Sequence, residues 1–407
     1  TPLVVFSGQV PLKAIGTNAF QEAPSIEITK SITKWSYQVK HVNELSYIVD
    51  KAFWIANNKK KGVVHIDLPK CVLTDILKDN KIKIFKQKYQ DNIKELTFSQ
   101  KEDIKTIANI INNSKKPIFY IGKGCIDAHK ELRKCAIKGN IPVTTTLHGM
   151  GIFDEEHDLS CEMVGMHGSY TANNAIQNSD CIICVGARFD DRTTGNLEYY
   201  APEAKKAYQE NRGGIIHCNI ESNEINSVVN SNYNINSGSK EFLEYLFPLL
   251  KINKNYVWKN KINYWKHKYP FTYVKGEKLK AQEVIIELNK QIKNKKEYIF
   301  TTGVGNHQMW ACQFIKWKEP QKIISSGSLG VMGAGLPYAI GAQIGNPDKN
   351  KLINKFSKPE PDEEILRHVL CKELGDAMQT ATYLVFYNYL KENSTYNKIK
   401  VKAITNE

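Results

Sequence analysis

Short apolar runs alternate with segments of helical periodicity along most of the chain. Between the first two runs, residues 43–58 carry apolar side chains on one helical face, namely Leu45, Ile48, Ala52 and Ile55. Short apolar strands that alternate with helices are typical of parallel sheets covered on both faces, and such sheets bind ligands beyond the carboxyl ends of their strands. We therefore predict an α/β fold made of doubly wound parallel sheets. The predicted strands are residues 2–10, 62–70, 117–122, 142–147, 180–187, 214–220, 297–305 and 322–330.

The same pattern divides the chain into three sheet-containing units. Their predicted boundaries are 1–75, a linker at 76–98, 99–250, a helical linker at 251–285, 286–350, and an unassigned helical tail at 351–407. The first strand begins within two residues of Thr1, and a parallel strand normally has earlier strands to pair with, so we expect the first unit to be incomplete. Ser99 and Glu102 form an S-x-x-E sequence, which predicts a capping box at the start of a helix.

Composition excludes several classes of protein. The chain has 407 residues, of which 42% are hydrophobic, but no apolar run reaches membrane-spanning length and no secretory signal opens it. Nine cysteines without a framework of regular spacing suggest a reducing compartment. Cys181-x-x-Cys184 lies in an apolar run without a second Cys or His pair, which favours strand packing over a metal site.

Positive charge leaves two interpretations open. The net charge is +14, and residues 251–280 combine many lysines with tyrosine and tryptophan, which would suit single-stranded nucleic acid. The alternative is an amphipathic helix between domains with one apolar stripe and solvated lysines, because the apolar residues recur at helical spacing. We favour the second interpretation, since Lys and Asn are spread along the whole chain. The stripe consists of Trp258, Ile262, Trp265 and Tyr269.

Three predicted strands end in glycine-containing loops. The loops are Gly122-Lys123-Gly124, residues 186–196 ("GARFDDRTTGN") and residues 301–310. Free backbone N–H groups at such positions can bind phosphate, although each loop alone also fits an ordinary turn. The two arginines and two aspartates of 186–196 fit either a charged ligand or a solvated ion-pair loop. No dinucleotide-binding or Walker fingerprint is present.

Several longer segments together resemble one enzyme family. In chain order they are "VVFSGQVPLKAIGTNAFQEA", "VHIDLPK", "TTLHGMG", "GMHG", "GARFDDRTTGN", "GGIIH", "TTGVGNHQMWACQF" and "SGSLGVMGAGLPYAIGAQ". They resemble the catalytic subunit of acetolactate synthase (acetohydroxyacid synthase), and the likeness runs from about Thr1 to Asp348. "GGIIH" resembles the eukaryotic versions.

The resemblance implies a fold, cofactors and a reaction. Three α/β domains are expected: a pyrimidine-binding one at 1–75, an FAD-binding one at 99–250 and a diphosphate-binding one at 286–350, with the first and third incomplete. The family transfers ketone-derived groups: thiamine diphosphate with Mg²⁺ condenses pyruvate with a second 2-oxo acid in valine, leucine and isoleucine synthesis, and FAD is largely structural.

The resemblance also assigns site residues by position. Gln21 and Phe20 match catalytic positions, and Pro11, Ala19, Lys70 and Asp191 match the substrate channel. The thiamine diphosphate positions are Asn306, His307, Gly330 and Met332. The FAD positions are Lys60, Gly122, Gly124, Thr146, Leu147, Gly165, Met166, His167, Gly186, Ala187, Arg188, Asp190, Arg192 and Asn219.

Departures from the family pattern set the remaining expectations. The activating glutamate would precede Thr1, and no metal motif follows Asp348, so no metal ligand is assigned and we expect these 407 residues alone not to make acetolactate. The alternative is a catalytically dead flavin- or nucleotide-binding scaffold. Expected partners are 2-oxo acids and further copies of the chain, as a homodimer or tetramer with or without a regulatory subunit, but neither nucleic acid nor membrane. The compartment would be a plastid or mitochondrion in a eukaryote and the cytoplasm in a bacterium. Residues that differ from the family are Lys60, Asn219, Ser239, Asn306 and Ser328.

Overall fold

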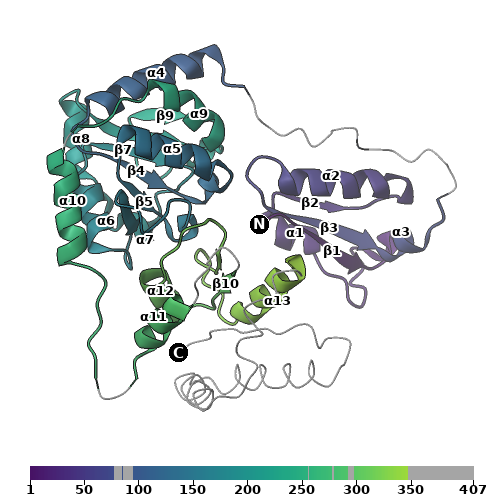
Figure 1. Ribbon diagram of the computed structural model, residues 1–407. Helices are drawn as coiled ribbons and strands as arrows, with labels where there is room; N and C mark the ends of the chain where they lie inside the picture. The colour runs from purple at the N-terminus through teal and green to yellow at the C-terminus, as the bar shows by residue number, and fades with distance from the viewer. Residues whose placement is uncertain (78–84, 86–94, 255, 277–278, 292–297, 347–407) are drawn as a thin grey trace. The chain divides into compact units, whose positions relative to one another are not determined.

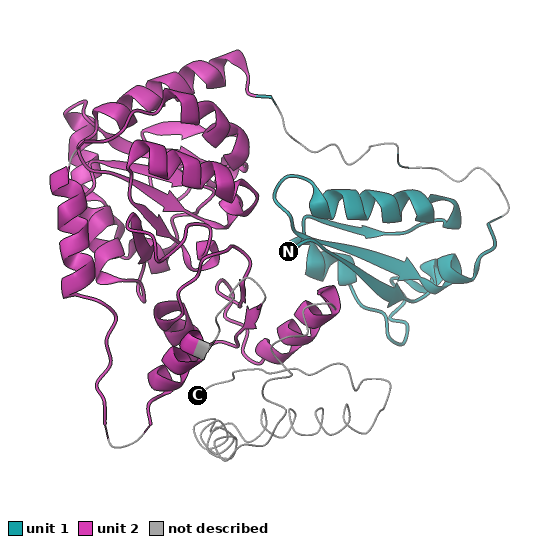
Figure 2. Cartoon of the chain, viewed as in Figure 1, with its two compact units in different colours: residues 1–95 teal, residues 96–407 magenta. Residues whose placement is uncertain are grey.

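The computed structural model describes residues 1–77, 85, 95–254, 256–276, 279–291 and 298–346. The chain separates into two compact units, unit 1 with residues 1–95 and unit 2 with residues 96–407 (Figure 2). The tail expected at 351–407 and most of the linker expected at 76–98 lie outside the described residues. Within the described part, no helix is both long and apolar enough to span a membrane.

Unit 1 is built on a parallel sheet of three strands in the order β1-β3-β2 (Figure 1). β1 (Leu3–Gln9) and β2 (Trp35–Gln38) both pair with β3 (Val63–Pro69), and α2 (Leu45–Asn57) packs against the sheet. The first two predicted strands and the helix between them are therefore confirmed, whereas β2 has no counterpart in the prediction. The other elements are η1 (Leu12–Ala14), α1 (Ser25–Lys30), η2 (Val42–Glu44) and α3 (Lys70–Thr74).

The apolar face predicted for α2 is correct at its centre. Ile48 and Ala52 are buried as expected, and Ala56 is buried with them. Leu45 and Ile55 are only partly buried at the margin of the same cluster.

Unit 2 contains a parallel sheet of six strands in the order β6-β5-β4-β7-β8-β9. The chain first moves outward from β4 to β6, then returns to the other side of β4 and moves outward again. The order therefore reverses between β4 and β7, which makes this pair the topological switch point of the sheet. The strands are β4 (Pro117–Ile121), β5 (Val143–Thr145), β6 (Ser160–Met163), β7 (Cys181–Val185), β8 (Gly214–Cys218) and β9 (Tyr233–Ile235).

Helices cover both faces of this sheet and bury two separate apolar clusters (Figure 1). Alternate residues of β4 point to opposite sides, so Phe119 joins one cluster and Tyr120 the other. The doubly wound α/β fold predicted from the sequence is confirmed. The first face carries α4 (Phe98–Asn113), α5 (His129–Gly139) and α9 (Ser239–Leu249), and the second α6 (Tyr170–Asn178), α8 (Pro202–Gln209) and α10 (Tyr256–Lys268).

The capping box expected at Ser99 and Glu102 is wrong. α4 begins two residues earlier, with Thr97 as its N-cap, and the reciprocal partner is Gln100. Thr97 Oγ1 accepts from the Gln100 N–H at 3.2 Å, while Gln100 Oε1 accepts from the Thr97 N–H at 2.9 Å. Both overlapping pairs fit the sequence rule, and the structure uses the earlier one.

The basic helix α10 belongs to the packing of the central sheet. Trp258, Ile262 and Trp265 are buried in the second apolar cluster, and the Trp258 indole N–H donates to the Pro117 carbonyl at 3.2 Å. Tyr269 lies just beyond the helix and is partly exposed. Three of the four residues in the predicted stripe therefore lie in the core.

The cysteine prediction at β7 is confirmed. Cys181 and Cys184 are buried on opposite faces of the strand, one in each apolar cluster. All cysteines in the described residues are free thiols. Burial raises the pKa of the Cys181 thiol to about 12, so this group behaves as an apolar side chain at neutral pH.

A third segment of the chain packs against the central part of unit 2. Trp317 is buried in a cluster with Met150 and Met163, and its backbone N–H donates to Glu155 Oε2 at 3.0 Å. The Arg133 guanidinium donates to the Lys318 carbonyl at 2.6 Å. The elements are α11 (Ala281–Gln291), β10 (Phe300–Thr301), α12 (Asn306–Phe314), β11 (Ile323–Ile324) and α13 (Gly335–Gly345), as the sequence predicts in type and order.

Candidate cofactor site

The strongest candidate site lies at the switch point between β4 and β7. Gly122 follows β4 directly and Gly186 follows β7, so both stand at the carboxyl edge of the sheet. Gly122 N–H donates to the Val185 carbonyl at 3.1 Å, and Gly124 N–H donates to the Gly186 carbonyl at 2.9 Å. The loops after the two strands are therefore joined backbone to backbone.

Side chains are excluded from this junction. A Cβ at Gly122 would lie 2.4 Å from Ala187 Cα, and a Cβ at Gly124 would lie 2.7 Å from Gly186 Cα. Gly186 also has a φ of +59°, which favours glycine. Bare backbone at the end of a switch-point strand gives a flat, polar surface on which a ligand can lie.

Three side chains form hydrogen bonds to backbone carbonyls of the loop after β7. The Tyr120 hydroxyl donates to the Arg188 carbonyl at 2.6 Å, while His217 Nε2 and Asn219 Nδ2 both lie 3.1 Å from the Ala187 carbonyl. Asn219 Oδ1 also accepts from the Glu221 N–H at 3.1 Å. Both polar ends of the Asn219 side chain, which the resemblance associates with FAD, are thus engaged by the protein.

Positive charge surrounds the junction. His148 is half-buried, and burial lowers its pKa, with further lowering by the charges of Lys123 and Arg188 and an opposite effect from Asp190. Those two cations therefore lie within electrostatic range of the same imidazole. Exposed cations beside bare backbone suit an anionic ligand such as a pyrophosphate.

The loop "GARFDDRTTGN" contains a helix cap and an exposed ion pair. Asp190 caps the short helix α7 (Asp191–Thr194) by accepting from the Thr193 N–H at 3.2 Å. Asp191 Oδ2 lies 3.7 Å from Arg192 Nε, and both side chains are exposed. Asp190 is thus occupied in local structure, whereas the Asp191–Arg192 pair faces solvent.

Other predicted FAD positions meet around Arg192. Met166 N–H donates to the Arg192 carbonyl at 2.8 Å, and a Cβ at Gly165 would lie 2.7 Å from the same oxygen. Thr146 N–H donates to the Ile121 carbonyl at 2.8 Å, which places Thr146 and Leu147 beside the end of β4. Of the predicted FAD positions, only Lys60 lies in unit 1; the others line adjoining strand ends of one sheet.

The predicted thiamine diphosphate loop lies in the same unit. A Cβ at Gly327 would be 2.6 Å from Leu147 Cδ2, and Gln313 donates to the His167 carbonyl at 3.0 Å. The loop continues through Gly330, whose φ is +65°, to Met332, which is 67% exposed. Asn306, which is exposed, and His307, which is buried, begin α12.

Unit 1 holds the predicted catalytic loop, which follows η1. Pro11 precedes η1, Phe20 is 89% exposed, and Gln21 has a φ of +67°. Lys70 is exposed at the start of α3, after β3. The structure therefore places Pro11, Ala19, Phe20, Gln21 and Lys70 in unit 1 and the remaining channel residue, Asp191, in unit 2.

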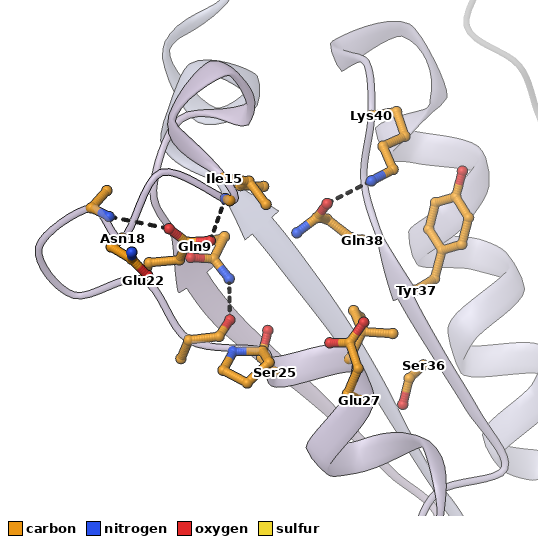
Figure 3. A pocket seen from close by; sticks show the side chains of 15 residues that line it. Gln9, Ile15, Asn18, Glu22, Ser25, Glu27, Ser36, Tyr37, Gln38 and Lys40 are labelled. Carbon is orange, nitrogen blue, oxygen red and sulfur yellow. Dashed lines mark hydrogen bonds between the residues drawn. The ribbon is translucent and has the colours of Figure 1, made fainter.

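An open pocket of about 780 Å³ adjoins this loop (Figure 3). Its lining includes Gln9, Ala19, Glu22, Gln38 and Lys40. Sequence reasoning missed the four polar or charged residues among these five, which are Gln9, Glu22, Gln38 and Lys40. Gln9 lies at the end of a predicted strand, which is a signal that the sequence does contain. Gln38 ends β2, which was not predicted.

Comparisons with known proteins identify the family. Residues 104–246 match the family model "Thiamine pyrophosphate enzyme, central domain", and residues 303–354 match "Thiamine pyrophosphate enzyme, C-terminal TPP binding domain". The chain thus carries two domains of the thiamine pyrophosphate enzymes, and the first of them includes most of the switch-point sheet.

The individual relatives that match the chain are acetolactate synthases. The catalytic subunit of mitochondrial acetolactate synthase from Saccharomyces cerevisiae is 41% identical over 394 residues, 94% of this chain and 56% of the relative. The mitochondrial acetolactate synthase of Schizosaccharomyces pombe is 43% identical over 85% of this chain and 54% of the relative. The chloroplastic enzyme of Arabidopsis thaliana is 38% identical over 85% and 51%.

The chain is accordingly a homologue of the acetolactate synthase catalytic subunits, and the resemblance found in its motifs is confirmed. It spans about half the length of the curated relatives it matches. Identity of 38–43% over 85–94% of the chain shows that it shares the fold of these relatives.

Proposed function

We propose that the protein has acetolactate synthase activity: thiamine diphosphate-dependent condensation of pyruvate with a second 2-oxo acid, in the synthesis of branched-chain amino acids. The observation that carries this proposal is 41% identity to an acetolactate synthase catalytic subunit over 94% of the chain. The glycine-lined switch point supports it, because that is where α/β sheets bind their ligands.

FAD fits the bare backbone and the cations of the switch-point junction. The residues that would hold it are the backbone at Gly122, Gly124 and Gly186, which leaves no room for side chains, and the cations Lys123 and Arg188. Bare backbone can approach a dinucleotide closely, and the two cations offset the charge of its pyrophosphate. In this proposal the bound flavin stabilises the central sheet.

Thiamine diphosphate fits the loop before α13. Gly330 and Met332 would hold its ring system, since exposed apolar side chains such as Met332 suit the face of an aromatic ring. A Cβ at Gly335 would lie 2.7 Å from the Gly303 N–H, so the start of α13 is packed closely behind the strand. When bound, the coenzyme supplies an electron sink for the charge left by loss of CO₂ from pyruvate.

The chain's own residues would bind and orient the 2-oxo acids. The exposed Phe20 ring offers an apolar wall, the Gln21 amide offers one donor and one acceptor group, and the exposed Lys70 ammonium attracts the substrate carboxylate. Asp191, which the resemblance also assigns to the substrate channel, lies in unit 2. Substrate orientation of this kind is a major source of rate enhancement.

Magnesium has no visible binding site in the part of the chain that the structure describes. No group of three or more His, Cys, Asp or Glu side chains lies close enough together there to hold a metal ion. We therefore assign no residue to Mg²⁺ and derive no step through it.

The test is acetolactate production. The protein, expressed from its gene and purified, is incubated with pyruvate, thiamine diphosphate, Mg²⁺ and FAD, and the product is measured as acetoin after acid treatment. We expect turnover that depends on thiamine diphosphate, together with rescue of a yeast strain that lacks its own acetolactate synthase. A protein that binds flavin but neither forms acetolactate nor rescues the strain would refute the activity and support a scaffold. The expectation that the 407 residues alone are inactive stays a prediction, which the same assay on this chain tests.

Assembly and compartment are part of the proposal. The relatives carry "mitochondrial" or "chloroplastic" in their names, so we propose a mitochondrion or a chloroplast for this protein. We also propose a homo-oligomer, which size-exclusion chromatography with light scattering would measure.

A further inference from the structure

The loop that carries Phe20 and Gln21 has a conformation that ordinary residues rarely adopt. Gly16, Asn18 and Gln21 all have positive φ, at +86°, +57° and +67°. Left-handed backbone at a residue other than glycine is unfavourable by about 1 kcal/mol or more and persists only where the surroundings hold it. Residues 16–22, here called the catalytic loop, therefore need specific contacts to keep this shape.

Glu22 supplies those contacts from inside the loop. Its Oε1 accepts from the Gly16 N–H at 2.5 Å and its Oε2 accepts from the Ala19 N–H at 3.2 Å (Figure 3). Its own N–H donates to the Ala19 carbonyl at 3.0 Å. One carboxylate thus spans the two N–H groups on either side of the turn, and hydrogen bonds to a charged acceptor are stronger than neutral ones.

A buried carboxylate fastens the end of the same loop to the sheet. Gln9 Nε2 donates to the Ala23 carbonyl at 2.7 Å and lies 3.4 Å from Asp67 Oδ2. Asp67 is fully buried and also accepts from Gln38 Nε2 and from the Ser7 hydroxyl, each at 2.8 Å. The backbone at Ala23, directly after the loop, is therefore held in place. The carboxylate of Glu22 then sets the conformation of residues 16–21.

We propose that Glu22 is a positioning residue, whose carboxylate holds the catalytic loop in the shape that brings Phe20 and Gln21 to the substrate. The inference rests on the proposed function, because it assigns Glu22 a purpose in that reaction. Glu22 acts through the loop backbone, since both of its carboxylate oxygens are occupied by N–H groups.

The experiment compares Glu22→Gln with Glu27→Gln in the purified protein. Glu27 lines the same pocket and is exposed, but its carboxylate makes no hydrogen bond to the loop in the described structure, so it is a matched control. A glutamine at position 22 has one acceptor oxygen where two are needed. We expect amide hydrogen exchange at Gly16 and Ala19 to accelerate by roughly tenfold or more in E22Q, and chymotrypsin to cleave faster after Phe20. E27Q should match the wild type.

Kinetics then separate positioning from general stability. In E22Q we expect kcat/KM for pyruvate to fall by roughly tenfold to a hundredfold, while bound flavin stays unchanged. On a Gln21→Ala background the same substitution should cause a much smaller further loss, because Glu22 acts through the loop that carries Gln21.

Each result decides the question. Unchanged exchange at Gly16 and Ala19 in E22Q would overturn the inference. The inference would also fail if E22Q lowered kcat/KM by the same factor on the Gln21→Ala background as in the wild type, because the two residues would then act independently. A wild-type protein that makes no acetolactate would refute the proposed function and with it the catalytic purpose of Glu22. The exchange rates would still show whether the carboxylate holds the loop.

Discussion

Replacing Gly122 by alanine tests whether the switch point depends on bare backbone. Gly122 has a φ of −114° and a ψ of −177°, an extended conformation that alanine adopts without strain. Any effect of Gly122→Ala is therefore steric. The new Cβ would lie 2.4 Å from both Ala187 Cα and the Gly186 carbonyl oxygen.

The size of the effect follows from that distance. Ordinary van der Waals contact begins at 3.4 Å, so the ends of β4 and β7 must separate by about 1 Å. Both obstructing atoms are backbone, which cannot rotate away as a flexible side chain could. Overpacking of a well-packed site typically destabilises by about 1–3 kcal/mol. For a unit of this size that lowers Tm by roughly 2–12 °C.

Thermal unfolding and flavin binding measure the outcome. We expect G122A to lose Tm in that range and to bind FAD at least tenfold more weakly, because the junction itself forms the proposed flavin surface. Gly341→Ala in α13 is the control, since no atom lies within 4 Å of a Cβ there. G122A with wild-type Tm and wild-type flavin content would show that the two loops separate freely and would refute the steric reasoning.

Three further substitutions test the packing of unit 2. Trp317→Ala removes a fully buried side chain and should destabilise the protein by about 3–5 kcal/mol in urea unfolding, with Trp317→Phe losing less; equal stability would contradict the burial. Asp180→Asn loses one of the two bonds that the carboxylate accepts from the Lys115 and Lys116 N–H groups, so Tm should fall by the equivalent of about 1–3 kcal/mol. Burial lowers the pKa of His217 below its ordinary value of 6.5, so the unfolded chain takes up this proton first and stability falls as the pH drops below about 6.5. His217→Leu should flatten the dependence of unfolding free energy on pH between about 7.5 and 5, and an unchanged slope would exclude His217 as its source.

The elements that sequence could predict share one property. The strands with continuous apolar runs, such as β4, β7 and β8, are buried on both faces, and each was predicted within two residues. β2, β6 and β9 were missed because they are short strands at sheet edges with polar residues among their few positions. A segment of three or four residues is too short for the alternation of apolar and polar side chains to identify a strand. Whether such a segment forms a strand depends on its pairing with a neighbouring strand.

Site residues divide in the same way. Glycines after apolar strands could be predicted from sequence, because a parallel strand must end at the carboxyl edge of its sheet. The contacts of Glu22 could not, since they depend on three positive φ values within the loop from Gly16 to Gln21. Asn219 shows a third case: its position was expected from the resemblance, but its bond to the Ala187 carbonyl depends on how β7 and β8 pair.

Strand order links these observations to chemistry. The reversal between β4 and β7 places the loops after both strands side by side with no helix between them, because the crossover connections lead away in opposite directions. Gly122, Gly124 and Gly186 carry no side chains, so the backbones of the two loops pack directly against each other there. The N–H groups of all three glycines are bonded within the protein, since Gly186 N–H donates to the Cys218 carbonyl at 3.0 Å. The hydrogen bonds from Gly122 and Gly124 to the β7 side satisfy part of the backbone, and the exposed cations Lys123 and Arg188 remain for an anion.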